Sequence, residues 1–178
     1  MARISNTSAY PNLVNPVSSD YLILTDQSDQ LLTKSCTLGD VQSLFGLDTL
    51  VAKVAVNSAS LMALNTTAAT LVAAPGTGKV IDVISIMFYL DAGAVAYDFG
   101  TGALPIKIGS EQIASIPNSG STINSAVDAV FKPEVPNSNE IIAQDTAVTL
   151  EAQANPTQGT GVLYANIFYR VLTVGSTF

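Results

Sequence analysis

The stretch from Lys79 to Asp91 constrains the fold more than any other part of the chain. Seven of the eleven residues between its two ends are β-branched or aromatic, a composition that favours a pleated strand over a helix. We therefore predict one long central strand. Alternation along it predicts one face made of Val80, Ile84, Ile86, Phe88 and Leu90, interrupted by Asp82, and an opposite face made of Ile81, Val83, Met87 and Tyr89, interrupted by Ser85.

Both predicted faces of this strand are largely apolar. A strand in a small antiparallel sandwich normally exposes one face to water, so a strand with two apolar faces needs a second cover. Another copy of the chain is the natural candidate, which predicts an oligomer. We expect its interface to use residues of the central strand and of the last strand, namely Ile84, Ile86, Phe88, Tyr164 and Phe168.

The charge content narrows the range of partners. Only 12% of the 178 residues are charged, against about 25% in an average globular protein, while 48% are hydrophobic. The net charge is −7, and the seven basic residues are spread singly from Arg3 to Arg170, so no basic patch is available to neutralise phosphates. We expect neither nucleic acid nor an anionic membrane as a partner.

The residue types needed for common catalytic and metal sites are scarce. The chain has no histidine and a single cysteine, Cys36, which excludes metal sites built from soft ligands and catalysis by a histidine base. The carboxylates that come nearest to an acid–base pair are Asp91 and Asp98 with Tyr97, and Asp82 with Glu151, but single carboxylates at strand ends usually form solvated turns. We predict no enzymatic activity, no catalytic residue, no cofactor and no metal.

Two further patterns favour turns over ligand sites. Pro75 to Lys79 has the glycines and lysine of a phosphate loop, but Ala73 and Val80 replace residues that such a loop needs, and a strand follows. Asp20, Asp26 and Asp29 lack the alternating ligands of a calcium loop and suit a hairpin turn.

No apolar run approaches the roughly 20 residues of a membrane span, and the N-terminus lacks the apolar core of a signal peptide, so we expect synthesis and retention in a cytoplasm.

The N-terminal segment predicts an anchor rather than a domain. Residues 1–19 read as an extended arm that orders only against a partner, and residues 21–25 and 31–35 flank a polar turn as a hairpin would. Thr37 and Asp40 form a helix-capping signal. Because residues 1–46 are too few for a core of their own, we predict that they bind another surface, with anchoring residues Tyr21, Leu22, Ile23, Leu24, Leu38, Val41, Leu44 and Phe45.

Residues 47–60 are ambiguous, because part of the segment fits a helical stripe and Val54 to Val56 alternates like a strand; we interpret them as a connector.

From residue 61 to 178, turn signals recur about every 8 to 12 residues, as in a β-sandwich. Predicted strands besides the central one cover 61–64, 70–74, 95–99, 104–108, 111–116, 140–143, 147–152 and 162–174, while 122–131 fits either a helix or a strand. Residues 162–174 are the natural partner of the central strand. The fold class predicted is mainly β, an antiparallel jelly-roll-like sandwich preceded by the small hairpin–helix anchor.

The segment from Asp20 to Phe45 resembles the short hairpin–helix that opens many virion structural proteins of tailed bacteriophages. The body is similar to phage head-decoration and head-fibre β-domains in its segments Leu71–Val80, Leu90–Gly93 and Gly159–Arg170. The resemblance implies a non-enzymatic homotrimer in the virion, on the capsid exterior, with the major capsid protein or another virion protein as its partner. It implies no catalytic residues.

A second function class stays open at this point. Jelly rolls also bind sugars, so a tail-associated receptor-binding or carbohydrate-binding domain is the alternative to a capsid decoration or head-fibre protein. Sugar sites favour exposed aromatic side chains, and the chain has no tryptophan and only six tyrosines. This composition favours the structural interpretation, and an enzyme ranks third.

Overall fold

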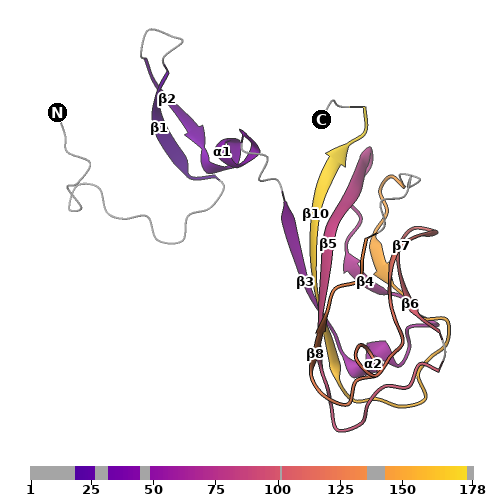
Figure 1. Ribbon diagram of the computed structural model, residues 1–178. Helices are drawn as coiled ribbons and strands as arrows, with labels where there is room; N and C mark the ends of the chain where they lie inside the picture. The colour runs from indigo at the N-terminus through magenta and orange to yellow at the C-terminus, as the bar shows by residue number, and fades with distance from the viewer. Residues whose placement is uncertain (1–18, 27–31, 45–48, 101, 136–142, 176–178) are drawn as a thin grey trace, which may run out of the picture. The chain divides into compact units, whose positions relative to one another are not determined.

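The computed structural model describes residues 19–26, 32–44, 49–100, 102–135 and 143–175. The chain forms two compact units, one ending at Asp48 and one beginning at Thr49. The described residues are mainly β, and every strand pair is antiparallel (Figure 1). The predicted class, mainly β with antiparallel sheets, is confirmed. Of the predicted arm at residues 1–19, residues 1–18 lie outside the described residues.

The first unit is a hairpin followed by a short helix, where the sequence predicts them: β1 (Tyr21–Asp26), β2 (Leu32–Thr37) and α1 (Leu38–Leu44). The predicted capping interaction at the start of α1 is confirmed, because Thr37 N donates to Asp40 Oδ2 at 2.8 Å and Asp40 N donates to Thr37 Oγ1 at 3.0 Å. These bonds satisfy amide groups that a helix start would otherwise leave unpaired. The Asp40 carboxylate accepts hydrogen bonds from the amide of Thr37 and from its hydroxyl at 2.8 Å, and these two bonds, the amide first, lower the pKa of Asp40.

The second unit contains two four-stranded sheets. Its elements are β3 (Leu50–Val56), α2 (Ser58–Leu61), β4 (Ala69–Val72), β5 (Lys79–Asp91), β6 (Leu104–Ile108), β7 (Glu111–Ile116), β8 (Ala129–Phe131), β9 (Val148–Leu150) and β10 (Val162–Thr173). Sheet I has the strand order β3-β10-β5-β8, and sheet II has the order β4-β9-β6-β7. Successive strands alternate between the sheets except at β6 and β7. This order fits the jelly-roll interpretation, which stays a prediction.

The central strand β5 is paired along its whole length with β10, as the sequence predicts, but it contains one irregularity. Phe168 faces Ser85 and the next residue, Tyr169, faces Val83, so Ile84 is an extra residue without a partner on β10. This is a β-bulge, and an extra residue exchanges the two faces of a strand from that point onward.

The bulge corrects the predicted faces of β5. Ile81 and Val83 lie on the same face as Ile86, Phe88 and Leu90, against the core. The opposite face then carries Asp82, Ser85, Met87 and Tyr89, and Ile84 is 46% exposed. The predicted assignment of residues to the two faces is therefore wrong, and the opposite face mixes polar with apolar residues. The oligomer stays a prediction.

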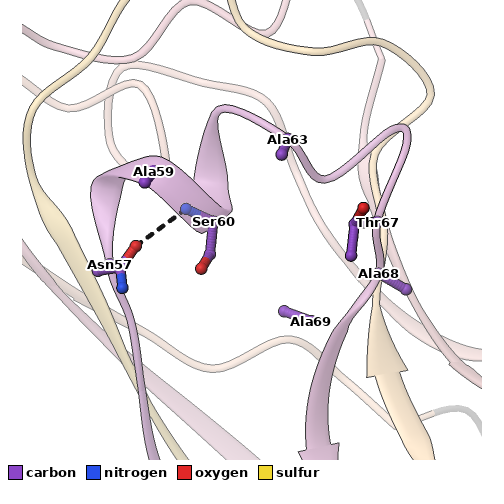
Figure 2. Close-up of a pocket in the computed structure, with 7 residues that line it drawn as sticks. All are labelled: Asn57, Ala59, Ser60, Ala63, Thr67, Ala68 and Ala69. Atoms are coloured by element: carbon purple, nitrogen blue, oxygen red, sulfur yellow. Dashed lines mark hydrogen bonds between the residues drawn. The ribbon is translucent and has the colours of Figure 1, made fainter.

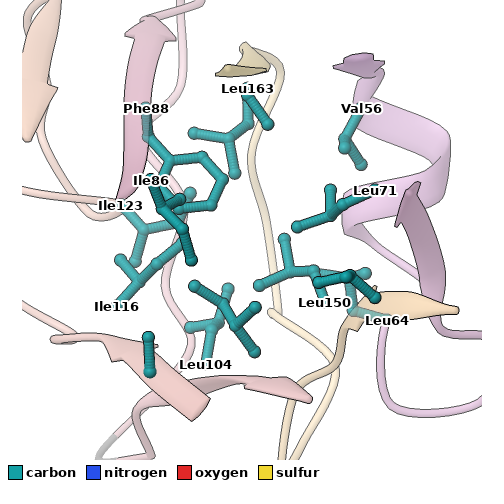
Figure 3. Close-up of a cluster of buried hydrophobic side chains, with 14 of the residues drawn as sticks. Val56, Leu64, Leu71, Ile86, Phe88, Leu104, Ile116, Ile123, Leu150 and Leu163 are labelled. Carbon is teal, nitrogen blue, oxygen red and sulfur yellow. The ribbon is translucent and has the colours of Figure 1, made fainter. Parts of the chain in front are cut away.

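The hydrophobic core lies between the two sheets. Figure 3 shows side chains from both sheets converging, with Ile86 and Phe88 from β5, Leu163 from β10, and Leu104 and Leu150 from sheet II. All five are at most 2% exposed. Complete burial of large apolar side chains is the main favourable term in folding, so this shared core holds the sheets together.

Two sequence interpretations in this unit need correction, and the segment 122–131, for which a helix and a strand were both open, is decided. Residues 50–56, taken as part of a connector, are strand β3 and pair with β10 from Tyr169 opposite Leu50 to Leu163 opposite Val56. Residues 61–64, predicted as a strand, belong to the end of α2 and the turn after it. Within 122–131 only the last three residues form a strand, β8. Of the predicted strand at 140–143, residues 140–142 lie outside the described residues.

The predicted strand at 95–99 is also absent, and its aromatic residues pack as a loop. Tyr97 and Phe99 are each 3% exposed, with ring centroids 5.8 Å apart. The Tyr97 hydroxyl donates to the Gly161 carbonyl at 2.6 Å. A Cβ on Gly159, whose φ is +143°, would overlap the Tyr97 ring, so glycine is required there. Side-chain packing fixes this loop together with two backbone hydrogen bonds, from Thr157 N to the Asp98 carbonyl at 3.1 Å and from Thr160 N to the Val95 carbonyl at 3.0 Å.

Candidate functional site

The candidate site is the outer face of sheet I, the face turned away from the core. It is formed by alternate residues of neighbouring strands: Val51, Lys53 and Ala55 from β3; Tyr164, Asn166, Phe168 and Arg170 from β10; Asp82, Ile84, Ser85, Met87 and Tyr89 from β5; and Val130 from β8. These side chains point outward because their neighbours in each strand contribute to the core. The face has several exposed apolar and aromatic groups, which is unusual for the solvent side of a sheet.

One row across this face runs Ala55, Tyr164, Tyr89 and Val130, each directly opposite the next. Tyr164 is 40% exposed and Tyr89 is 36% exposed. Their rings stack with centroids 5.9 Å apart and planes inclined by 21°. Cross-strand aromatic pairs of this kind stabilise a sheet and fix the rings in place.

Asp128 holds Tyr89 from the side of β8. The Tyr89 hydroxyl donates to Asp128 Oδ2 at 3.0 Å, and Asp128 Oδ1 accepts from the amide of Ala92 at 2.9 Å. The hydrogen bond to Asp128 is the largest cause that raises the pKa of Tyr89 above its ordinary value, because deprotonation would place a phenolate beside a carboxylate. At neutral pH the phenol is protonated and its orientation is fixed.

A groove of about 320 Å³ lies along the row on the side of β3. Its lining is Lys53, Val54, Ala55, Tyr89, Tyr164, Ala165 and Asn166. Asn166 and Lys53 face each other across the β10–β3 pair, one outward position away from Tyr164 and Ala55. The groove thus has an aromatic wall, a small floor at Ala55 and a polar end.

Three of the four carboxylates weighed for acid–base chemistry, Asp82, Glu151 and Asp98, have structural partners. Asp82 Oδ2 accepts from Arg170 Nη2 at 2.5 Å and from Arg170 Nε at 3.1 Å. Glu151 Oε2 accepts from Lys107 Nζ at 2.6 Å. Asp98 Oδ1 accepts from the amide of Gly100 at 3.0 Å. These contacts are those of ion pairs and a turn.

The glycine-rich segment Pro75 to Lys79 is a turn into β5. Gly76 and Gly78 have φ of +95° and +73°, which glycine adopts without strain. The Gly76 amide donates to Asp145 Oδ1 at 2.9 Å, and the Lys79 amide donates to the Gly76 carbonyl at 3.1 Å. A carboxylate thus accepts from a backbone amide that a phosphate loop would offer to its ligand, which agrees with the predicted turn.

A second hollow, of about 350 Å³, lies beside α2 and is lined by Asn57, Ala59, Ser60, Ala63, Thr67, Ala68 and Ala69. Figure 2 shows Asn57 turned toward the helix, where its Oδ1 accepts from Ser60 N at 2.9 Å. This bond caps α2. The lining carries small and uncharged side chains, and its one oriented polar group is used by the helix.

Across the described ranges, no group of three or more Cys, Asp or Glu side chains is arranged to hold a metal ion. In the same ranges no helix is long and apolar enough to cross a membrane.

The structure separates the residues predicted for an oligomer interface. Ile84, Tyr164 and Phe168 lie on the outer face of sheet I, with Phe168 half-buried. Ile86 and Phe88 are 2% and 0% exposed and belong to the chain's own core, because the bulge at Ile84 turns them inward. We withdraw these two from the interface prediction. The other three stay a prediction.

The predicted anchoring residues all map to the first unit. Tyr21 and Leu22 on β1 are 71% and 37% exposed, and Leu38 and Val41 on α1 are half-buried. Ile23 and Leu24 belong to β1 and Leu44 to α1. Phe45 lies outside the described residues.

The sequence does not predict the groove or the residue that holds its wall. The groove residues in question are Lys53, Ala55, Tyr89 and Asn166, and Asp128 holds Tyr89. The residues come from three strands and a loop, and nothing in the linear sequence shows which strands are neighbours. Once β10 is paired with β5, one signal is available, because Tyr164 and Tyr89 fall directly opposite each other. The position of Ala55 beside them does not follow from the sequence, because residues 47–60 predict a connector and not a strand paired with β10.

No family model and no curated protein matches the chain. Among solved structures, the cyanophage Pam1 capsid asymmetric unit matches with a TM-score of 0.39 and 15% identity, covering 68% of this chain and 83% of that chain. The capsid of Ralstonia phage GP4 matches with a TM-score of 0.32 and 16% identity, covering 72% of this chain and 84% of that chain. At these TM-scores the likenesses establish neither the fold nor the function of this chain.

Proposed function

We propose that the chain is a non-enzymatic structural protein of a phage virion, a capsid decoration or head-fibre protein that binds the capsid exterior as a homotrimer. The observation that carries the proposal is the division of the chain into a hairpin–helix unit and a separate sandwich with its own core. In this proposal the first unit binds the shell through the major capsid protein or another virion protein, and the second unit projects from it.

The exposed apolar residues of the first unit support an attachment role. Tyr21 exposes 71% of its surface on a six-residue strand, and Leu22 beside it exposes 37%. Exposed tyrosine is favourable at protein contacts, since its ring gives apolar area and its hydroxyl gives a hydrogen bond. A small unit held by a few such contacts gains strength when several copies are linked, because the second and third contacts form at high local concentration.

The outer face of sheet I supports contacts between copies. Ile84 is 46% exposed beside the half-buried Phe168, and Val51 on β3 is 44% exposed in the same region. The charged residues nearby, Arg170 and Asp82, neutralise each other. We propose that copies meet over Ile84 and Phe168. The number three comes from the resemblance to head-decoration and head-fibre domains.

Removal of the first unit tests the attachment role. The variant lacking residues 1–48 retains the core of the sandwich, so it should unfold cooperatively, and it should no longer co-sediment with particles prepared without the protein. In the full chain, the double substitution Tyr21→Ser and Leu22→Ser should weaken co-sedimentation, whereas Val127→Ser, at a residue 70% exposed on the second unit, should not. Wild-type occupancy by the truncated chain would contradict the assignment.

Native mass measurement at micromolar concentration tests the oligomer. The full chain should be a trimer, and Ile84→Lys should give monomers because an ammonium group would be buried in the contact. Val95→Lys is the control, since Val95 is 40% exposed in a loop. A monomeric wild-type chain, or an Ile84→Lys chain that stays trimeric, would contradict this part of the proposal.

A further inference from the structure

We infer that the groove beside Tyr164 binds a pyranose ring of a glycan, a function additional to the proposed structural role. The groove is the one on the outer face of sheet I lined by Lys53, Ala55, Tyr89, Tyr164 and Asn166. It lies four residues along β10 from Phe168, so we assign Tyr164 to this site and not to the contact between copies.

The order of residues in the row leaves one face of the Tyr164 ring available. Tyr164 lies between Tyr89 and Ala55, and its stack with Tyr89 uses the ring face on the side of β5. On the side of β3, the groove next to Tyr164 is lined by Ala55, whose methyl group fills little of the space above the strand. The hollow beside the ring therefore results from a large residue next to a small one in the same row.

An available aromatic face suits one chemical class of ligand. The C–H bonds on one face of a pyranose ring are weakly positive, and the face of an aromatic ring is negative, so the two surfaces attract each other as well as burying apolar area. The groove volume of about 320 Å³ is in the range of small-molecule sites. One or two sugar units match this size.

The polar end of the groove suits the hydroxyl groups at the edge of such a ring. The Asn166 side chain offers both a donor and an acceptor, and Lys53 offers donors. Lys53 makes no ion pair with any residue in the described part of the chain, so its ammonium group is available to a ligand. Sugar hydroxyls need both kinds of partner when they leave water.

The aromatic wall is fixed before a ligand arrives. Asp128 holds the Tyr89 hydroxyl, Tyr89 stacks on Tyr164, and Asp128 is itself held by the amide of Ala92. A wall that is already ordered loses little side-chain entropy on binding, which favours weak ligands such as single sugars.

The test uses the full chain on an array of bacterial capsular polysaccharides and lipopolysaccharide O-antigens, followed by calorimetric titration with the oligosaccharides that bind. The wild type should bind at least one of them. Tyr164→Ala should weaken that binding by about tenfold or more, because it removes the ring face, and Tyr164→Phe should retain it. Ala55→Leu leaves each proposed sugar contact in place but fills the hollow, so it should also abolish binding.

Val130→Ala is the matched control, because Val130 lies at the other end of the same row, is 63% exposed and is not part of the groove. It should bind as the wild type does. Native mass and thermal unfolding of every variant show whether it is folded and in which oligomer. The inference is overturned if no glycan on the array binds, if Ala55→Leu binds normally, or if Ala55→Leu and Tyr164→Ala change the oligomer, since the groove would then be a contact between copies.

Discussion

The two faces of sheet I are made by the same strands and differ in almost every physical respect. On the inner face, Ile86, Phe88 and Leu163 are at most 2% exposed and pack against sheet II. On the outer face, Tyr89 and Tyr164 are more than a third exposed. The inner face holds the fold together, and the outer face carries apolar and aromatic area that the folding of one chain does not bury.

This difference is the reason that we propose contacts with other molecules on the outer face. Exposed apolar groups are common on protein surfaces when they are single, but Ile84, Val51, Tyr89 and Tyr164 lie on neighbouring strands of one sheet. The bulge at Ile84 creates the difference, because it sends the apolar residues after it inward and Ser85, Met87 and Tyr89 outward. The bulge thus keeps the apolar residues before and after Ile84 on the core face.

The largest effect is expected when a paired residue of β5 is deleted. Met87 pairs with Asn166, so its deletion would shift the residues that follow by one position and turn Phe88 toward water. We expect a loss of about 5 kcal/mol or more, comparable with the whole stability of many domains, and no cooperative transition by circular dichroism or urea unfolding. Deletion of Ile84 is the control: because Ile84 has no partner on β10, its removal leaves the other pairs in register, and the variant should still unfold cooperatively. A folded Met87 deletion, or an unfolded Ile84 deletion, would contradict this account of the two faces.

The next largest effect separates two neighbouring residues on opposite faces. Phe88→Ala removes a ring that is 0% exposed, and we expect it to lower the free energy of unfolding by about 3 to 5 kcal/mol. Tyr89→Ala, one residue along, should lower it by less than half of that loss, because the Tyr89 ring is partly in water already. Urea unfolding of both variants measures the difference. Equal losses would show that the faces do not differ as described.

The raised pKa of Tyr89 predicts that the free energy of unfolding depends on pH in alkaline solution. Its folded-state pKa is raised above the ordinary value of 10.0, so the folded state retains a proton that the unfolded state loses first. The associated stability is complete below pH 10 and is lost as the pH rises through the folded-state pKa. The stability advantage of the wild type over Tyr89→Phe should therefore shrink above pH 10. An advantage that grows with pH would contradict the hydrogen bond to Asp128.

The smallest effect is expected at the ion pair on the outer face. Arg170 and Asp82 have side chains 48% and 38% exposed, so water and salt screen their attraction. Arg170→Gln should lower the free energy of unfolding by no more than about 1 kcal/mol, and the loss should be smaller at high salt. Thermal unfolding at low and high ionic strength checks both points. A larger, salt-independent loss would mean that the outer face contributes to folding more than we infer.

The long strands could be predicted because their composition is unambiguous. β5 is found at Lys79–Asp91 and β10 at Val162–Thr173, close to the ranges that their β-branched and aromatic residues indicate. β6 and β7 also have the predicted bounds. The helix α1 follows from its capping residues, Thr37 and Asp40, which form the bonds that the pattern implies.

The failures have physical causes that a single sequence hides. β3 is rich in alanine and valine, and its apolar residues fit a helical stripe as well as a strand, so only the pairing with β10 decides between them. The sequence gives one weak indication of the bulge. Asp82 and Ser85 are three residues apart, so a regular strand would place these two polar residues on opposite faces. Tyr97 and Phe99 were assigned to a strand on their composition, but a glycine at 159 and the carbonyl of Gly161 accommodate them in a loop.

A cryo-EM reconstruction of phage particles that carry this chain, as the proposed function requires, tests the central claim most directly. The account predicts density for the sandwich on the outside of the capsid, in clusters of three, joined to the shell through the hairpin–helix unit and with the Tyr164 groove open to solvent. Capsids that show no such density, or density for the chain only at the tail tip, would contradict it.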